Sequence, residues 1–344
     1  MNLNFRPSLR IFLAAFLLAL PLLAADNVEL ERAKTWFREG RIDEAVALLE
    51  RLVTTSTLSK SDRVEALEVL AFCNIARERE DRVRASFTQI LNLDFSYEPR
   101  DSYLSHPAVM RAWLGARKEV LGNFMPAPPS GIRTIAILDF DNNSLEESDK
   151  LANLGKGLAD MLITDLATLS KLKVVERERI QFILEEIQRS EAVVAGQRLT
   201  DPDFAVQVGK LLGAQSMLLG SYIKVNNKLR LDVRLIKTET SEIIKTESVE
   251  GKPDAVFDLT KKLAIKLSED LEVELNKVEE DNLKRLRKED IALEAAMAYS
   301  EALHMLDQER YNEARQMLVK ALEISPGFRM AREKLSVLQT FQKS

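Results

Sequence analysis

The stretch that decides the fold class is Thr134-Ile-Ala-Ile-Leu-Asp-Phe140, a near-continuous apolar run. Such a run is typical of a strand that is buried on both faces of a sheet. The leucines of 150–170 recur at three- and four-residue steps, which predicts a helix directly after this strand. The following residues predict a strand, two helices, three strands and a helix, at 173–176, 178–190, 203–212, 216–225, 228–237, 242–250 and 253–275. The order β-α-β-α-α-β-β-β-α predicts an α/β domain with a mixed sheet over 132–276.

The last three strands are expected to form a meander. Asn226-Asn227 predicts a two-residue turn, because Asn tolerates positive φ. In the strand after that turn, apolar residues alternate with charged ones, which predicts one core face and one face toward water. The apolar set is Leu229, Leu231, Val233 and Leu235, and the charged set is Arg230, Asp232 and Arg234.

Helical spacing returns on both sides of this domain, at 26–124 and 291–344. Both blocks fit the small, aromatic and large positions of degenerate tetratricopeptide repeats, in which small residues let two antiparallel helices approach closely. The last block carries the frame Ala302, Tyr311, Ala314, Leu318, Ala321 and Pro326, and the first carries Ala33, Trp36, Gly40, Ala45 and Leu49. A capping helix is predicted at 328–342, and a helix over 106–121 closes the first block.

The remaining segments predict export and domain boundaries. Residues 1–25 combine basic residues, an apolar run from Ile11 to Leu23 and small residues, as a signal peptide does, with cleavage after Ala24 or Ala25. An uncleaved anchor helix is the alternative, although the apolar run is shorter than the about 20 residues that a spanning helix needs. Residues 125–131 are a Pro-rich linker, and 277–290 a charged connecting helix.

Composition excludes several functions. The 344 residues carry a formal net charge of −5, without the basic excess that nucleic-acid binding requires. Two histidines, His106 and His304, and one cysteine, Cys73, cannot form a zinc cluster, so the histidines are expected on the surface or in packing. Cys73 lies among apolar residues, which predicts a buried thiol. No cofactor, metal or catalytic residue is predicted.

Two features of the central domain could belong to a cation-binding or a phosphate-binding site. Asp139 and Asp141 end the first strand, at the edge where α/β proteins often form sites, yet we expect them to cap the next segment rather than hold a cation. Gly155-Lys156-Gly157 lacks the spacing of a phosphate-binding loop. We therefore expect its glycines to allow close helix packing.

Three motifs in order resemble the CsgG/TolB-N-terminal/FlgO group of bacterial envelope domains. They are Ile135-Ala-Ile-Leu-Asp-Phe140, Val174-Val-Glu-Arg177 leading into Ile180 and Leu184-Glu185, and Val208-Gly-Lys-Leu-Leu-Gly-Ala214 leading to Leu219-Gly220-Ser221. The resemblance covers about the middle two fifths of the chain. It implies a small domain that binds other proteins or self-associates, and brings no catalytic residues. Curli-type channels of this group are lipoproteins with added membrane-spanning hairpins, whereas no Cys lies near the cleavage site here and the hairpin joins are short.

The expected function is therefore non-enzymatic: a periplasmic assembly or secretion-accessory component, exported and peripherally associated with the outer membrane, with no integral span after cleavage. Its repeats would bind other envelope proteins, and homo-oligomerisation through the α/β domain is a further hypothesis. In the last repeat Tyr299, Leu303 and Leu306 are the candidate protein contacts, with burial between units as the equal alternative. The rival functions are a periplasmic enzyme with a site near Asp139 and Asp141, and an outer-membrane channel component.

Overall fold

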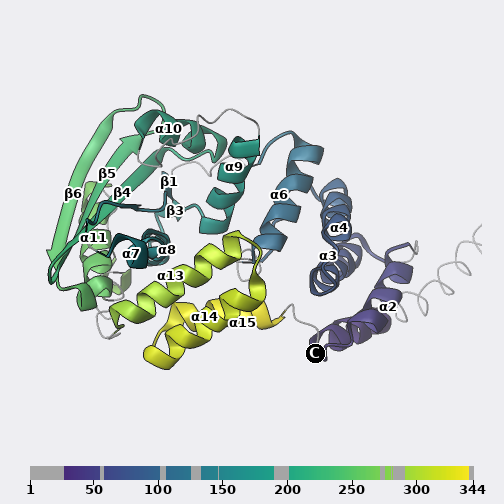
Figure 1. The fold of residues 1–344 in the computed structure, drawn as a ribbon. Coiled ribbons are helices and arrows are strands. Elements are labelled where there is room, and N and C mark those ends of the chain that lie inside the picture. Colours follow the sequence, from purple (N-terminus) through teal and green to yellow (C-terminus); the bar gives the residue numbers. More distant parts are fainter. Residues whose placement is uncertain are drawn as a thin grey trace, which may run out of the picture. The chain divides into compact units, whose positions relative to one another are not determined.

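The computed structural model describes residues 27–54, 58–100, 106–124, 133–145, 147–189, 201–271, 276–279, 281 and 291–340. Its contacts divide the chain into two compact units. Unit 1 takes the described residues within Met1–Arg100, Ala112–Asn123 and Gln339–Ser344, and unit 2 those within Asp101–Arg111 and Phe124–Leu338. Figure 1 labels helices and strands of both units.

Unit 1 is helical. After a helix over 27–38 come α2 (Ile42–Thr54), α3 (Lys60–Ala76) and α4 (Glu80–Leu93), and α6 (Pro107–Leu121) contributes its part from Ala112 onward. Gly40 turns the chain at φ 75°, a conformation that favours glycine. Consecutive helices pack through apolar faces, as the helical spacing predicts.

Cys73 lies inside the core of unit 1 with no exposed surface, which confirms the predicted buried thiol. Burial raises its pKa to about 12. A thiol with so high a pKa carries almost no thiolate at neutral pH and is a weak nucleophile.

Unit 2 contains the sheet. Its strands are β1 (Arg133–Ile137), β2 (Asp141–Asn142), β3 (Leu172–Val174), β4 (Ser216–Val225), β5 (Lys228–Lys237) and β6 (Ile243–Gly251). The order is β3-β1-β4-β5-β6, with β2 beside β4. β1 is parallel to β3 and β4, whereas β4, β5 and β6 are antiparallel, so the predicted mixed sheet is confirmed.

The turn between β4 and β5 lies where it was predicted. Val225 opposes Lys228 across the Asn226-Asn227 turn, and Asn226 adopts φ 51°. The four apolar residues of β5 are buried, and the charged ones between them are wholly or partly exposed. One core face and one wet face are therefore confirmed.

The helices of the α/β domain are α7 (Ser148–Leu151), α8 (Leu154–Leu166), α9 (Arg177–Arg189), α10 (Pro202–Leu211) and α11 (Val256–Asp270), the last preceded by the 3₁₀ turn η1 (Pro253–Ala255). The predicted helix at 150–170 is thus two helices. The strand β2 is an addition to the predicted order: two residues are too few to show a period in the sequence.

Three further helices complete unit 2: α13 (Leu293–Asp307), α14 (Tyr311–Ile324) and α15 (Arg329–Thr340), of which unit 2 holds the part up to Leu338. The small and large positions of the predicted repeat frame, Ala302, Ala314, Leu318 and Ala321, are all fully buried, so α13 and α14 approach closely. The tetratricopeptide assignment stays a prediction.

Several predicted segments lie outside the described residues: the signal peptide 1–25, the linker 125–131 and most of the charged segment 277–290. Of the last, 277–279 are helical, and Asn276 accepts hydrogen bonds from the backbone N–H groups of Val278 and Glu279. Across the described ranges, none of the helices has the length and apolarity required to span a bilayer.

Candidate functional site

The carboxyl end of β1 is the site that the sequence offers for chemistry. Asp139 is 7% exposed, and its Oδ2 accepts hydrogen bonds from Lys156 Nζ at 3.0 Å and Gln181 Nε2 at 3.1 Å. Arg177 Nη2 lies 3.6 Å from the same oxygen. Asp139 therefore does not cap the next segment, as the sequence suggests, but neutralises two cations from α8 and α9.

Asp141 belongs to β2, where it pairs with Ser221 of β4. In the described part of the chain no group of three or more His, Cys, Asp or Glu side chains is placed to hold a metal ion.

Lys156 reaches Asp139 because glycines flank it. A Cβ on Gly155 would lie 1.9 Å from the carbonyl oxygen of Phe140, and one on Gly157 would lie 2.1 Å from Ser300 Oγ. Real Cβ atoms do not come so close, so each glycine permits a contact that no other residue would. The predicted role of these glycines in close packing is confirmed: α8 touches the end of β1 on one side and α13 on the other.

Asp307, at the C-terminal end of α13, completes the cluster. It accepts hydrogen bonds from Arg177 Nη1 at 2.8 Å, Arg177 Nη2 at 2.7 Å and Lys156 Nζ at 2.8 Å. Burial opposes ionisation of Asp307, but the charges of Arg177 and Lys156 prevail and lower its pKa to about 2. We call Asp139, Lys156, Arg177 and Asp307 the β1-end cluster.

A second set of buried polar contacts joins α15 and α13 to the α/β domain. Lys334 of α15 donates to Glu178 of α9 at 2.6 Å, and both side chains are nearly inaccessible to solvent. Burial opposes the charge on Lys334, yet Glu178 and Asp160 raise its pKa. The Tyr299 hydroxyl of α13 donates to Asp160 of α8. Charged contacts thus bind the C-terminal helices of unit 2 to the α/β domain.

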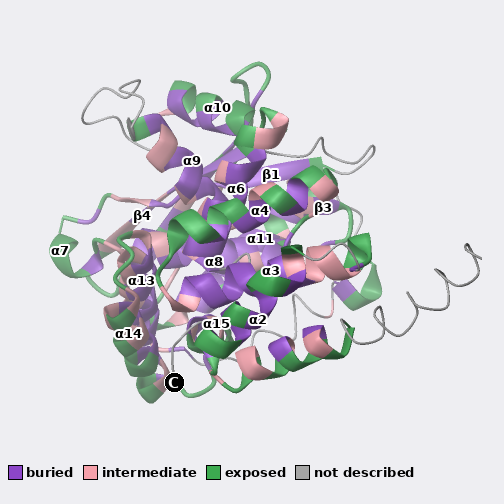
Figure 2. Cartoon of the chain, turned by 90° about the vertical axis from the view of Figure 1, so that its right-hand side faces the viewer, coloured by how far each residue is buried: buried purple, intermediate pink, exposed green. Residues whose placement is uncertain are grey.

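The residues predicted to bind another protein lie within this packing. Tyr299, Leu303 and Leu306 are 1%, 0% and 1% exposed. The face of α13 packs on α8, which is buried along most of its length (Figure 2). The Tyr299 ring also lies 4.9 Å from that of Phe328. Of the two roles considered for these residues, the structure favours burial, with α8 of the same chain as the covering element.

His106 shows the packing role that was expected of it. Its ring stacks on Tyr311 with centroids 5.2 Å apart, and burial lowers its pKa to about 3. The imidazole is therefore neutral over the physiological range of pH.

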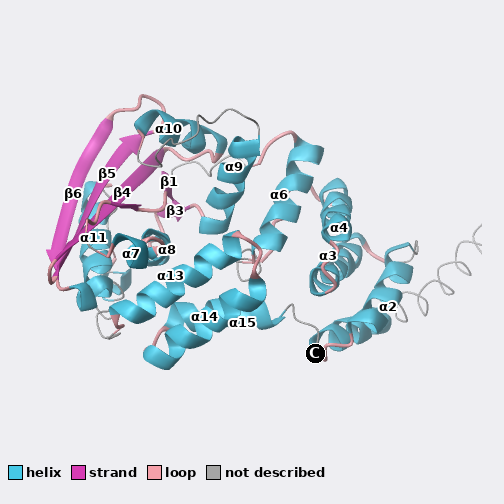
Figure 3. Cartoon of the chain, viewed as in Figure 1, coloured by secondary structure: helices cyan, strands magenta, loops and turns pink. Residues whose placement is uncertain are grey.

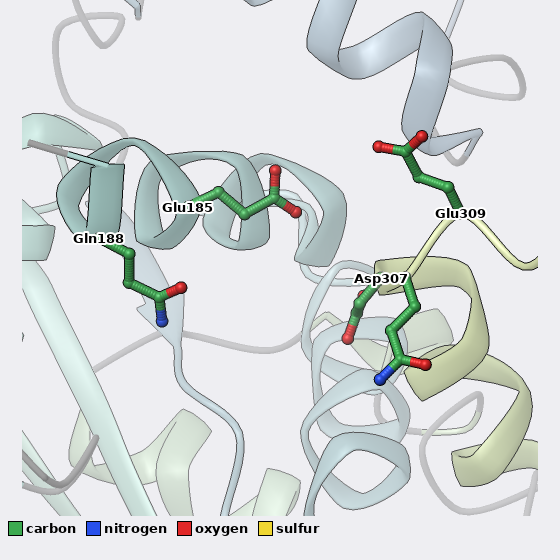
Figure 4. A pocket seen from close by; sticks show the side chains of 5 residues that line it. Glu185, Gln188, Asp307 and Glu309 are labelled. Atoms are coloured by element: carbon green, nitrogen blue, oxygen red, sulfur yellow. The ribbon is translucent and has the colours of Figure 1, made fainter. Parts of the chain in front are cut away.

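One open pocket of about 400 Å³ lies next to the β1-end cluster (Figure 4). It is lined by Glu185, Gln188, Asp307, Gln308 and Glu309, which come from α9 and from the end of α13 and the turn after it. Three of these five residues are acidic, but Asp307 is paired with Arg177 and Lys156, and Glu309 lies 3.0 Å from Arg111.

Asp139 and Lys156 of the β1-end cluster stand in features that the sequence marks, whereas Arg177 lies in a resemblance motif without a predicted role and Asp307 gives no local signal. Arg177 and Asp307 are 130 positions apart, and no spacing rule spans such a separation. Only a charged residue inside an otherwise apolar helix face, as Lys334 is, could have drawn attention.

One family model matches part of the α/β domain. Residues 122–230 match the model of the family described as curli production assembly/transport component CsgG. This range includes β1 to β4 and the start of β5, and it lies where the three sequence motifs place the resemblance.

A protein of Rhizobium meliloti (strain 1021) with the name "Putative adenylate cyclase 3" is 27% identical over 215 residues, 62% of this chain. The match covers 33% of that protein, so the chain spans about a third of the length of this curated relative.

Three solved structures are also similar. TolB from Acinetobacter baumannii has a TM-score of 0.27 at 12% identity and covers 42% of this chain and 29% of its own. The LpoB C-terminal domain from Salmonella enterica has a TM-score of 0.26 at 14% identity, and the match covers 44% of this chain and 99% of that domain. The PelC dodecamer from Paraburkholderia phytofirmans has a TM-score of 0.24 at 12% identity, and the match covers 44% of this chain and 94% of the PelC chain.

Proposed function

We propose that this protein is a non-enzymatic component of the bacterial cell envelope that binds other proteins in an assembly or secretion-accessory role. The observation that carries the proposal is the match of residues 122–230 to the CsgG family model, whose description names assembly and transport. The signal peptide predicted at 1–25 agrees with an exported, periplasmic chain, and peripheral association with the outer membrane is part of the proposal.

The state of the β1-end cluster supports a role without catalysis. A general acid or base needs a proton-accepting atom that a substrate can reach. Asp139 instead has both a lysine and an arginine within 3.6 Å, and Asp307 accepts three hydrogen bonds from the same two cations. These carboxylates serve to attach α13 to the α/β domain.

We do not extend the cyclase named for the Rhizobium relative to this chain. The match leaves two thirds of that protein uncovered.

We also propose that the chain is not itself a pore. Two residues join β4 to β5, and five residues, 238–242, join β5 to β6. Each membrane-spanning strand needs about 9–11 residues, so neither join can hold an inserted hairpin.

The decisive experiment expresses the full chain with a C-terminal tag in a bacterial host, fractionates the cells and captures partners from the envelope fraction. We expect a mature chain in the periplasm and reproducible envelope proteins in the eluate. A chain that stays cytoplasmic, or a periplasmic one that is monomeric and captures nothing, would refute the proposal. The enzyme alternative is tested by thermal unfolding with nucleotides and divalent metals, where stabilisation would favour it.

A further inference from the structure

Strand β6 forms an outer edge of the sheet in the described structure (Figure 3). Its neighbour is β5, and it is exposed over most of its length. In an antiparallel ladder every second residue turns its N–H and C=O away from its neighbour. The outer side of β6 therefore presents a row of backbone donors and acceptors to whatever strand can reach it.

Natural edges are often blocked by bulges, proline or short length. The register shift of β6 lies at its beginning, where Leu235 and Ile236 change partners. From Lys245 to Gly251 the pairing with β5 is regular, and no proline interrupts it. This part of β6 is a regular template for another strand.

We propose that β6 pairs antiparallel with β6 of a second copy of this chain, with Thr246 opposite Thr246 of that copy. A twofold axis perpendicular to the sheet generates such a pair and keeps each residue on its own face. Only registers centred on a residue are then allowed, because directly opposed side chains share a face.

Charge selects this register among its neighbours. With Thr246 on the axis, Lys245 of each copy opposes Glu247 of the other, and opposite charges stabilise a cross-strand pair. A centre at Lys245 or at Glu247 would oppose two like charges, which is unfavourable.

The intramolecular ion pairs of β6 fit the same arrangement. Lys245 contacts Asp270 at 2.9 Å and Glu247 contacts Lys266 at 2.6 Å, both on α11. In the pair of strands, a row of alternating charge forms across the axis. It consists of Asp270 and Lys245 of one copy, followed by Glu247 and Lys266 of the other.

This inference rests on the assembly role proposed above and specifies its surface. Disulfide formation between single cysteines tests it directly in the full mature chain. Thr246→Cys places two thiols opposite each other across the axis, whereas Ser248→Cys places them about 14 Å apart, four strand positions out of register. Both positions are exposed, and Cys73, with its high pKa, contributes no background.

We expect mild oxidation, or a thiol-reactive linker shorter than 8 Å, to convert most of Thr246→Cys to a covalent dimer and to leave Ser248→Cys monomeric. Equal crosslinking of the two variants, or crosslinking of Ser248→Cys alone, overturns the inference. So does a native chain that sediments as a monomer at about 100 µM. A dimer that does not crosslink at Thr246 overturns the β6 surface but leaves the envelope role standing.

A charge exchange gives an independent test. Lys245→Glu and Glu247→Lys should each weaken self-association at least tenfold, because each creates like pairs across the axis. The double variant restores unlike pairs across the axis but places like charges against Asp270 and Lys266, so it should recover part of the affinity that each single variant loses. Lys320→Glu, an exposed position on α14, matches the charge change of Lys245→Glu and should have no effect. A double variant no better than the singles, with circular dichroism showing all of them folded, refutes the register.

Discussion

Replacement of Asp307 by Asn tests whether the β1-end cluster holds the C-terminal helices on the α/β domain. The variant removes the negative charge that faces Arg177 and Lys156 and keeps the shape of the side chain. Arg177 is 3% exposed, so its charge cannot be solvated by water instead. Removal of one partner of a buried ion pair typically costs about 3–5 kcal/mol.

The pKa of Asp307 gives a second route to the magnitude. Its ordinary value of 3.8 in the unfolded chain falls to about 2 in the folded protein. At 1.36 kcal/mol for each pH unit between the two values, ionised Asp307 contributes about 2 kcal/mol. Because the folded pKa is the lower one, this stability is present above pH 4 and is lost as the pH falls toward 2. We expect Asp307→Asn to cost more than this 2 kcal/mol, because it also leaves the buried positive charge of Arg177 without one of its negative partners.

The assay has to report on unit 2. Both tryptophans, Trp36 and Trp113, lie in unit 1, so their fluorescence does not serve. Hydrogen exchange of amides in β4 and β5 reports directly on opening of the sheet. We expect Asp307→Asn to speed this exchange by about a hundredfold or more, which corresponds to about 3 kcal/mol. The variant should also lose the part of the acid sensitivity between pH 4 and 2 that Asp307 causes.

Asp232→Asn is the matched control. Like Asp307, Asp232 accepts three hydrogen bonds. All three come from Arg230, at 2.7–3.0 Å, and this pair lies on the wet face of the sheet. Exposed pairs contribute little, so the control should leave exchange unchanged. If Asp307→Asn changes exchange no more than Asp232→Asn does, burial does not give the cluster its strength and the reasoning fails.

Three further predictions concern single side chains. Gly155→Ala should lower the free energy of unfolding by about 1–3 kcal/mol in urea titrations, since its Cβ meets a backbone oxygen, whereas Gly327→Ala has open space and should be neutral. Tyr299→Phe leaves the buried carboxylate of Asp160 without this donor and should cost about 1–3 kcal/mol in the same titration; no change would mean that water replaces the hydroxyl. Cys73 should resist thiol reagents at pH 8 until urea unfolds unit 1, and fast labelling of the folded chain would contradict its burial.

The buried charges also explain why the C-terminal helices and the α/β domain form one compact unit. An apolar face can slide on another with little loss, but an arginine that must meet Asp307 and a lysine that must meet Glu178 define one arrangement. Buried ion pairs need not add net stability, and their best attested effect is to select one packing among several. Ion pairs of this kind hold α13 and α15 in a single position on α8 and α9.

Local patterns in the sequence determined the α/β class, the element order, the meander with its Asn226 turn and the close packing at Gly155-Lys156-Gly157. Each depends on residues within a few positions of one another, where backbone geometry imposes a period or a turn. The motifs of the central domain belong to the same local level, and the family match falls on them.

Only the tertiary structure decided what covers Tyr299 and which charges Asp139 meets. The sequence left two roles open for Tyr299, because a face of apolar and aromatic residues looks the same whether another protein or the same chain covers it. Asp139 was expected to cap a neighbouring segment, but Lys156, Arg177 and Asp307 approach it or its partners from α8, α9 and α13. Interactions between residues more than a hundred positions apart depend on how whole elements pack, and no local period records that packing.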